Sequence, residues 1–161
     1  MAAGRADGFE AMYRRELTPM IALGTTLTGS SDAGVDLAHE AMLRAYRAWP
    51  SVEAMDRPGA WVRRVLINLA IDRHRRMRRE ETVVRRLTPE VATGAPEVDQ
   101  FWATVRTLPD RQRAAVALRY IDDMTVEQIA EVLEVSPGTV KTSLFRAHKT
   151  LETTLRAQEV R

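Results

Sequence analysis

Residues 125–149 read TVEQIAEVLEVSPGTVKTSLFRAHK, and this stretch contains two helix starts separated by a short turn. Thr125, followed three positions later by Gln128, forms a capping box and predicts a helix of about eight residues. Ser136-Pro137 predicts the start of a second helix, because serine caps a helix and proline fits its first turn. Two helices joined by a turn of about three to four residues are typical of a helix-turn-helix.

The inner and outer faces of this hairpin differ in chemistry. The side chains expected between the helices are Ile129, Leu133, Val135 and Val140, and those expected outside are Lys141, Thr142, Arg146 and Lys149. No acidic residue occurs between positions 135 and 149, so the outer face suits a DNA groove. The alternative is an ordinary helical hairpin with a solvated face.

Two positions of the hairpin are less regular. Glu134 stands where such a turn usually takes glycine in a left-handed conformation, and we expect this to cost about 1 kcal/mol of stability. Phe145 lies one position off the apolar stripe of the second helix. It either wedges against the first helix or contacts DNA.

The residues before this hairpin also have helical periodicity. Val98 to Val105 predict a short amphipathic helix, and Leu108-Pro109-Asp110 predict the start of another that runs to Ile121. Between Thr82 and Pro96 the periodicity is lost and small residues, Pro and Gly increase. We therefore expect a flexible linker over 82–97 between a domain at 1–81 and a domain at 98–161.

The first domain is predicted to contain three helices. The first begins at Asp7 as its N-cap and is kinked or restarted at Pro19, and the second is capped by Asp32 and ended by Pro50. A loop over 50–57 precedes a third helix that starts at Pro58. Strand-like alternation is hard to find, so the fold class is all-α with two small helical domains.

Composition limits the classes of function. The chain has 161 residues, 24 basic against 22 acidic side chains, a net charge of +2, three histidines and no cysteine. These numbers exclude a disulfide framework or a thiolate metal site, and the scattered histidines argue against metal binding. No stretch approaches the roughly 20 apolar residues of a membrane span, so we expect a cytoplasmic protein without membrane insertion.

Residues 57–86 carry a net charge of +7. Within them the run from Arg73 to Arg79 is either a solvated surface or an anion-binding one.

The second half resembles region 4 of bacterial extracytoplasmic-function (ECF) sigma factors. The matching segments are Leu108-Pro109-Asp110-Arg111-Gln112-Arg113, Thr125 to Ala130, Ser136 to Thr142 and Phe145-Arg146-Ala147. The first half resembles region 2 of the same family. Its matching segments are Asp36 to Tyr46, Trp61 to Val65, Asn68, Ile71-Asp72 and Arg75-Arg76. Both sets occur in the family's order.

The resemblance implies a promoter-specificity subunit of RNA polymerase and assigns three sets of residues. Contacts to core polymerase fall to Asp36, Leu37, His39, Glu40 and Arg44, contacts to the −10 element to Asn68 and the nearby loop, and contacts to the −35 element to Arg119, Lys141, Thr142, Phe145 and Arg146. The charge pattern adds Lys149 to the −35 set and Arg73, Arg75, Arg76 and Arg79 to the −10 set. The implied partners are the β′ clamp helices and β flap of the polymerase core, promoter DNA and an anti-sigma factor. Val35 and His39 depart from the family's usual acidic residue and Gln.

Two other classes of function are alternatives to this interpretation. A stand-alone helix-turn-helix regulator, with residues 1–80 as a partner or dimer domain, explains the second half equally well. A nucleic-acid-processing enzyme lacks support, because no paired carboxylates, Gly-rich phosphate loop or spaced metal ligands occur. We therefore expect no catalytic residues, no metal and no cofactor.

Overall fold

A computed structural model describes residues 2–81 and 96–161, which form eight helices and no strand. The helices are α1 (Ala2–Thr28), α2 (Ser31–Arg47), α3 (Trp49–Glu53), α4 (Pro58–Glu81), α5 (Pro96–Arg106), α6 (Asp110–Tyr120), α7 (Val126–Leu133) and α8 (Pro137–Glu159). The all-α prediction is confirmed. The expected linker at 82–97 lies outside the described residues except for its end, where α5 begins.

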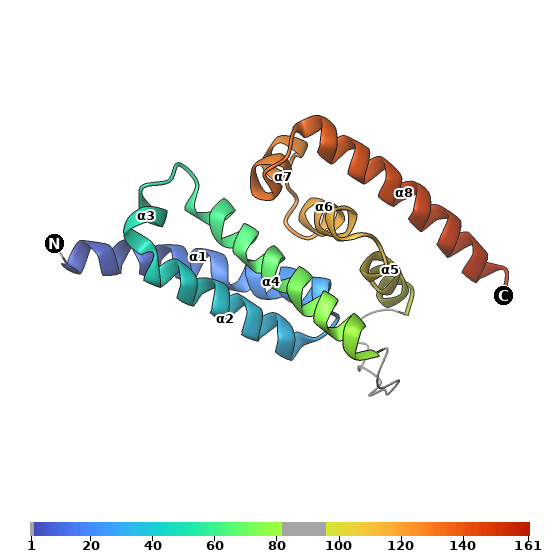
Figure 1. The fold of residues 1–161 in the computed structure, drawn as a ribbon, viewed down its shortest axis with the longest axis horizontal. Helices are drawn as coiled ribbons and strands as arrows, with labels where there is room; N and C mark the ends of the chain where they lie inside the picture. The colour runs from blue at the N-terminus through green and yellow to red at the C-terminus, as the bar shows by residue number, and fades with distance from the viewer. Residues whose placement is uncertain (1, 82–95) are drawn as a thin grey trace.

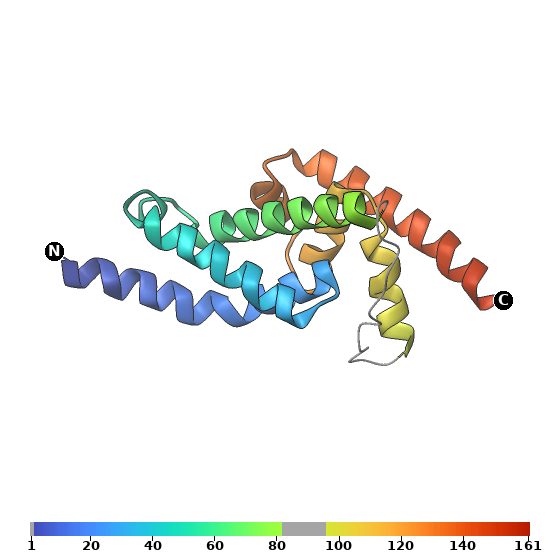
Figure 2. The ribbon, with the colours of Figure 1, turned by 60° about the horizontal axis from the view of Figure 1, so that its bottom comes forward.

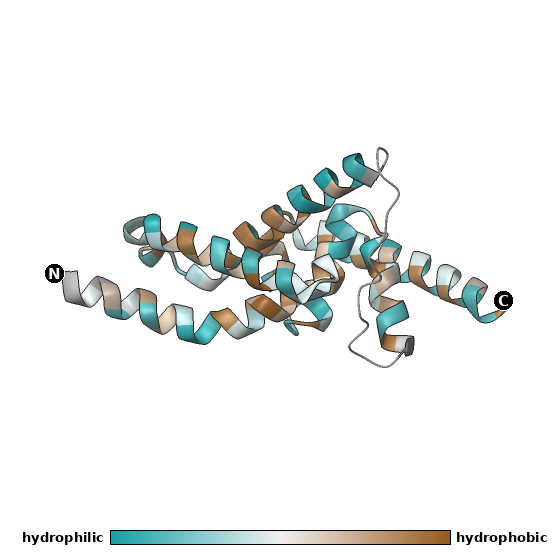
Figure 3. Cartoon of the chain, turned by 90° about the horizontal axis from the view of Figure 1, so that it is seen from below, coloured by the Kyte–Doolittle hydropathy of each residue, from teal (hydrophilic) through white to brown (hydrophobic). Residues whose placement is uncertain are grey.

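The first half is a bundle of α1, α2 and α4, with α3 at one end (Figure 1). Met20, Leu23, Ala41 and Leu66 are fully buried where the three long helices meet. α1 and α2 approach closely at Gly34. A Cβ on this residue would clash with the backbone of Thr25, so the close approach requires glycine. Figure 3 shows hydrophobic positions along the faces where helices meet and hydrophilic ones toward the end of α4.

The expected N-caps of the first two helices are wrong. α1 already begins at Ala2, so Asp7 lies inside it, and the helix continues through Pro19. Burial of apolar side chains just beyond the proline offsets the backbone hydrogen bond that it removes. α2 is capped by Ser30, whose side chain accepts a hydrogen bond from the amide of Ala33, and not by Asp32.

Local backbone geometry makes Ser30 rather than Asp32 the N-cap of α2. Gly29 adopts a positive φ of 76° directly after the end of α1. A left-handed residue ends a helix, so the next residue is the first in extended conformation and takes the N-cap position. Asp32 then falls in the first turn of α2, where its negative charge still stabilises the helix by interacting with the positive end of the helix dipole.

The predicted loop over 50–57 is partly wrong, because it contains α3. Pro50 lies in the first turn of that short helix rather than ending the previous one. A proline fits there, since the first turn has no backbone partner for its missing N–H. Trp49 and Val52 are buried and attach α3 to the bundle.

The second half contains the predicted helix-turn-helix as α7 and α8. Both hydrogen bonds of the capping box between Thr125 and Gln128 are present, at 3.2 and 2.9 Å. Ser136 caps α8 by accepting from the amide of Thr139. Glu134 has the expected left-handed conformation, with φ 54°. The prediction for this segment is confirmed at each of these positions.

The two halves lie against each other. α4 lies between α2 and the second half in both Figure 1 and Figure 2, and it contacts α7 directly. α1 contacts α6 and α5. α8 runs along the outer side of the second half and ends at the C-terminus, far from the N-terminus (Figure 1). α4 therefore has neighbours in both halves.

Candidate nucleic-acid interface

The outer face of α8 is cationic and open. Lys141, Thr142, Arg146 and Lys149 are all exposed, as predicted. The hydroxyl of Thr142 donates a 3.0 Å hydrogen bond to the carbonyl of Gly138 within the same helix. The opposite side of α8 carries buried Val140, Leu144, Ala147 and Leu151 and fixes the helix on the second half. This packing leaves the basic side chains directed outward.

Phe145 is exposed on α8, with 69% of its surface accessible. It therefore does not wedge against α7. An aromatic ring left open among basic side chains suits contact with a base rather than with the protein core.

Arg119 is exposed at the end of α6, but one of its N–H groups already donates a 2.8 Å hydrogen bond to the carbonyl of Met124. It thus holds the turn before α7 as well as facing solvent. The neighbouring Tyr120 hydroxyl lies 2.7 Å from Nε2 of His148 on α8. These contacts join α6 to both helices of the helix-turn-helix.

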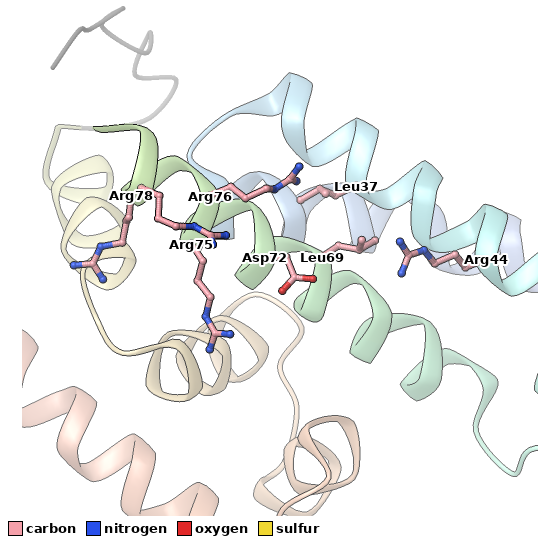
Figure 4. A pocket seen from close by; sticks show the side chains of 8 residues that line it. Leu37, Arg44, Leu69, Asp72, Arg75, Arg76 and Arg78 are labelled. Carbon is pink, nitrogen blue, oxygen red and sulfur yellow. The ribbon is translucent and has the colours of Figure 1, made fainter. Parts of the chain in front are cut away.

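A second cationic feature lies between α2 and the end of α4, and we call it the arginine groove (Figure 4). It has a volume of about 760 Å³ and is lined by Leu37, Arg44, Leu69, Asp72, Arg75, Arg76, Arg78 and Arg79. Arg76 points toward Leu37 on α2, whereas Arg75 points toward α6. Several guanidinium groups around a shallow apolar floor suit a polyanion.

Asn68 and Arg75 belong to a row on α4 that faces the second half. The row, which we call the α4 stripe, consists of Arg64, Asn68, Ile71 and Arg75, at the spacing that places residues on one side of a helix. Three of its members line a cleft of about 240 Å³ against α6 and α7. Arg75 instead bonds to Asp110 of α6 at 2.9 Å.

Arg73 differs from the other predicted −10 residues. It is half-buried, and its Nε is buried without a hydrogen-bond partner in the described structure. Two residues before Arg75 on a helix, it projects to the other side of α4. It lines neither the arginine groove nor the cleft beside Asn68.

The predicted polymerase-binding residues form one exposed strip of α2. Asp36, His39 and Arg44 are exposed, and Leu37 and Glu40 are half-buried. Glu40 already pairs with Arg44 at 3.1 Å, and His39 lies 3.4 Å from the hydroxyl of Tyr13. Sequence reasoning missed Leu43 and Tyr46 beside this strip, which expose 42% and 61% of their surface.

Arg63, near the start of α4, was given no role from the sequence. Arg63 bonds to Glu16 at 2.7 Å and to Asp122 at 2.9 Å. Burial alone would lower the pKa of Arg63, but the charges and hydrogen bonds of the two acids outweigh it and raise that pKa. Burial also raises the pKa of Asp122, against the opposing effect of Arg63. The signal was absent because these partners lie up to 59 residues away in the sequence.

Comparison with known proteins decides the family. The Sigma-70 region 2 family matches residues 12–80, and the Sigma-70 region 4 family matches residues 99–151. The ECF RNA polymerase sigma factor SigW of Bacillus subtilis is 28% identical over 148 residues, which cover 81% of this chain and 79% of that protein. The RNA polymerase sigma-E factor of Streptomyces coelicolor is 29% identical and covers 98% of this chain and 91% of its own.

The chain belongs to the ECF RNA polymerase sigma factors. Its fold agrees with that of the sigma factor RpoE from Bartonella quintana, solved in complex with the anti-sigma factor NepR. That structure has a TM-score of 0.72 and 22% sequence identity, and the match covers 92% of this chain and 96% of the other. The stand-alone regulator is not favoured, because the first half of this sigma factor matches region 2.

Within this sigma factor, α1 to α4 correspond to region 2 and α5 to α8 to region 4. Among the described residues, no group of His, Asp and Glu is arranged to hold a metal ion. In the same part of the chain, no helix has the length and apolar character needed to cross a membrane.

Proposed function

We propose that this sigma factor, which directs promoter-specific transcription initiation, reads its promoter with two surfaces and binds core polymerase with a third. The surfaces are the outer face of α8 with Arg119 for the −35 element, the α4 residues Asn68, Arg75, Arg76 and Arg79 for the −10 element, and the α2 strip of Asp36, Leu37, His39, Glu40 and Arg44 for the β′ clamp helices. One observation carries the proposal: the acid-free face of α8 and the arginine groove lie on separate halves of one chain.

The −35 assignment follows from what the major groove offers. The groove admits one α-helix, and its guanine edges accept hydrogen bonds from Arg or Lys. Lys141 and Arg146 supply those donors, and the open ring of Phe145 suits the methyl group of thymine. Arg119 on α6 and Lys149 farther along α8 are assigned to phosphates, which position the helix without specifying sequence.

The −10 assignment rests on a neutral amide beside several cations. Asn68 is exposed on α4 and offers both a donor and an acceptor to a base edge. Arg75, Arg76 and Arg79 follow along the same helix and can neutralise successive phosphates. Arg73 is left out of this set, because its side chain is half-buried and lines neither the arginine groove nor the cleft beside Asn68.

The polymerase assignment rests on an exposed strip whose charges can pair with a basic helix. Region 4 is proposed to contact the β flap, so that two weak DNA contacts are tied to one enzyme. Each contact then gains from effective concentration, and neither half needs high affinity alone. The sigma factor acts in the cytoplasm, supplies no catalytic chemistry of its own and, like the Bartonella protein, binds an anti-sigma factor.

The −10 proposal is tested by replacing Arg75, Arg76 and Arg79 with Gln in reconstituted holoenzyme. Glutamine is a good helix former, so the helical content should stay unchanged. We expect holoenzyme assembly to persist while open complexes become rarer. On single-stranded DNA each lost phosphate contact should make the salt slope shallower by about 0.7.

Arg73→Gln is the matched control, because it removes one positive charge from the same helix on its other side. It should leave open-complex yield and salt slope at the parental values. If the triple variant also matches the parent in both measurements, α4 does not contact the −10 region.

A further inference from the structure

One histidine of region 4 lies at the edge of the surface assigned to the −35 element. Lys141, Phe145 and His148 follow one another along α8 at spacings of four and three residues, which places them on one side of the helix. All three side chains are exposed. His148 therefore belongs to the same outer face of α8, although the function proposed above does not use it.

Tyr120, at the end of α6, holds the ring of His148. The Tyr120 hydroxyl lies 2.7 Å from Nε2 of His148, and the two ring centroids are 5.8 Å apart. Tyr120 exposes 53% of its surface, so the pair is open to solvent. Among the described residues, none bonds to Nδ1 of His148. This second ring nitrogen is therefore available to a ligand.

A phenol is a partner that suits both charge states of an imidazole. When the ring is neutral, the Tyr120 hydroxyl donates to Nε2 and Nδ1 carries the ring hydrogen. When the ring is charged, Nε2 donates to the phenol oxygen and Nδ1 still carries a hydrogen. A carboxylate in the same place would instead favour the charged ring. The contact thus fixes the orientation of the ring and leaves its charge to follow the pH and the ligand.

No acid of the described structure neutralises a charge on this ring. On α8 the charged neighbours are Lys141, Lys149 and Glu152, and Glu152 already pairs with Arg156 at 2.7 Å. On α6 the neighbour of Tyr120 is Arg119, a further cation. The described acids on the helices that pack against α8 do not bond to His148, and these are Asp99, Asp110, Glu127 and Glu131. A charged His148 therefore has to find its anion outside the protein.

A phosphate of duplex DNA is such an anion. When a recognition helix lies in the major groove, the preceding helices lie against the DNA backbone. His148 stands on the side of α8 that meets α6, and Arg119 on α6 is already assigned to a phosphate. The Nδ1–H group can donate a hydrogen bond to a phosphate oxygen, and this bond is stronger when the ring is charged.

We propose that His148, positioned by Tyr120, is a proton-dependent phosphate contact of the −35 surface. Histidine changes its charge between about pH 5 and 8, and a phosphate favours the charged ring. Protonation and DNA binding therefore strengthen each other, so the affinity for duplex DNA rises as the pH falls through this range. The inference rests on the proposed −35 role of α8. Tyr120 acts on the DNA only through the ring and is thus a positioning residue.

The experiment titrates the full chain against a fluorescent duplex of random sequence, with anisotropy as the signal and constant ionic strength. Phosphate contacts carry no sequence information, so a random duplex reports them. We expect the parent to bind about fivefold more tightly near pH 6 than near pH 8, which is the lower end of typical coupling between two ligands. His148→Gln cannot become charged and should lose this gain. Near pH 6 its salt slope should be shallower than the parent's by up to about 0.9.

Three further variants separate the charge of the ring from its position. His148→Arg is always charged and should bind more tightly than His148→Gln near both ends of the pH range of about 6 to 8. His74→Gln, the matched control in region 2, should keep the parental dependence on pH. Tyr120→Phe keeps the aromatic ring and removes the hydroxyl, so it should reduce the gain at low pH while circular dichroism shows unchanged helical content.

Two results would overturn the proposal. If the parent and His148→Gln depend on pH to the same extent, His148 does not contact phosphate. If Tyr120→Phe keeps the parental pH profile, Tyr120 does not position the ring. Failure of the −35 assignment is recognised separately, because Lys141→Ala with Arg146→Ala would then bind the same duplex as tightly as the parent near pH 8, where histidine is mostly neutral.

Discussion

Arg63 of α4 donates a 2.9 Å hydrogen bond to Asp122, which lies in the turn between α6 and α7. The same guanidinium bonds to Glu16 of α1. One largely buried cation therefore joins α4 both to its own bundle and to region 4. If one of the two acids is removed, the Arg63 guanidinium still pairs with the other acid, but it loses one of its hydrogen bonds.

We expect Asp122→Asn to lower the free energy of unfolding by roughly 1 to 3 kcal/mol, because a hydrogen bond between charged groups is weakened in a mostly buried place. Urea denaturation followed by circular dichroism measures the change. Asp123→Asn is the control, since Asp123 is exposed and asparagine tolerates its positive φ of 52°. Equal stability of the two variants would show that the Arg63 bond contributes nothing.

Lys141→Ala and Arg146→Ala should weaken promoter binding by roughly 1 to 3 kcal/mol each where the contact is to a base edge. A phosphate contact would instead lose affinity evenly across promoter sequences. Gel-shift titration of holoenzyme on parental and mutated −35 elements separates the two cases. Arg156→Ala, near the end of the same helix, should leave binding unchanged. If both α8 variants initiate transcription as well as the parent protein does, the assignment of α8 as the recognition helix is wrong.

Charge reversal of Asp36 and Glu40 to Arg should abolish association with core polymerase, because like charges then face the partner helix. Reversal of Glu10 and Glu152, which are exposed elsewhere, is the control and should preserve association. Size-exclusion chromatography with purified core enzyme provides the measurement. If core binding survives the first reversal, the polymerase interface lies outside this strip of α2.

The stability of region 4 should depend on pH through Asp110. Burial alone would raise the pKa of Asp110, but hydrogen bonds from Arg113 and Arg75 and their positive charges outweigh it and lower that pKa. An acid with a lowered pKa stabilises the fold above its unfolded value of about 3.9, and this contribution is lost as the pH falls through the folded value.

The measurement compares the unfolding free energy of the parent with that of Asp110→Asn at several pH values. The difference should stay constant between about pH 5 and 7 and shrink below about pH 4. A difference that is as large at pH 3 as at pH 7 would contradict the assignment of the stabilisation to a charged Asp110.

The sequence was most informative where side chains act on their own backbone. The capping box at Thr125, the cap at Ser136 and the left-handed Glu134 all follow from local rules, and all three are present. Local rules were ambiguous around residues 29 to 32, where several residues can cap a helix. Only the conformation of Gly29 decides that Ser30 does so.

Contacts between the halves were beyond sequence reasoning. Nothing near Arg64 indicates that its partners are the carbonyls at the end of α7, which lie up to 68 residues away. Helical periodicity tells which side of α4 Arg75 occupies, but not what faces that side. The predicted −10 residues were therefore split by the structure into a row facing region 4, a groove facing α2, and Arg73 on neither.

The order of synthesis gives the α4 stripe an unprotected interval on the ribosome. Region 2 ends at Glu81, while the segment that meets the stripe runs from Asp110 to Glu134. At about 5 to 20 residues per second, roughly 3 to 11 s separate the translation of Glu81 from that of Glu134. The nascent chain therefore carries the arginines of the α4 stripe before the acids that pair with them have been made.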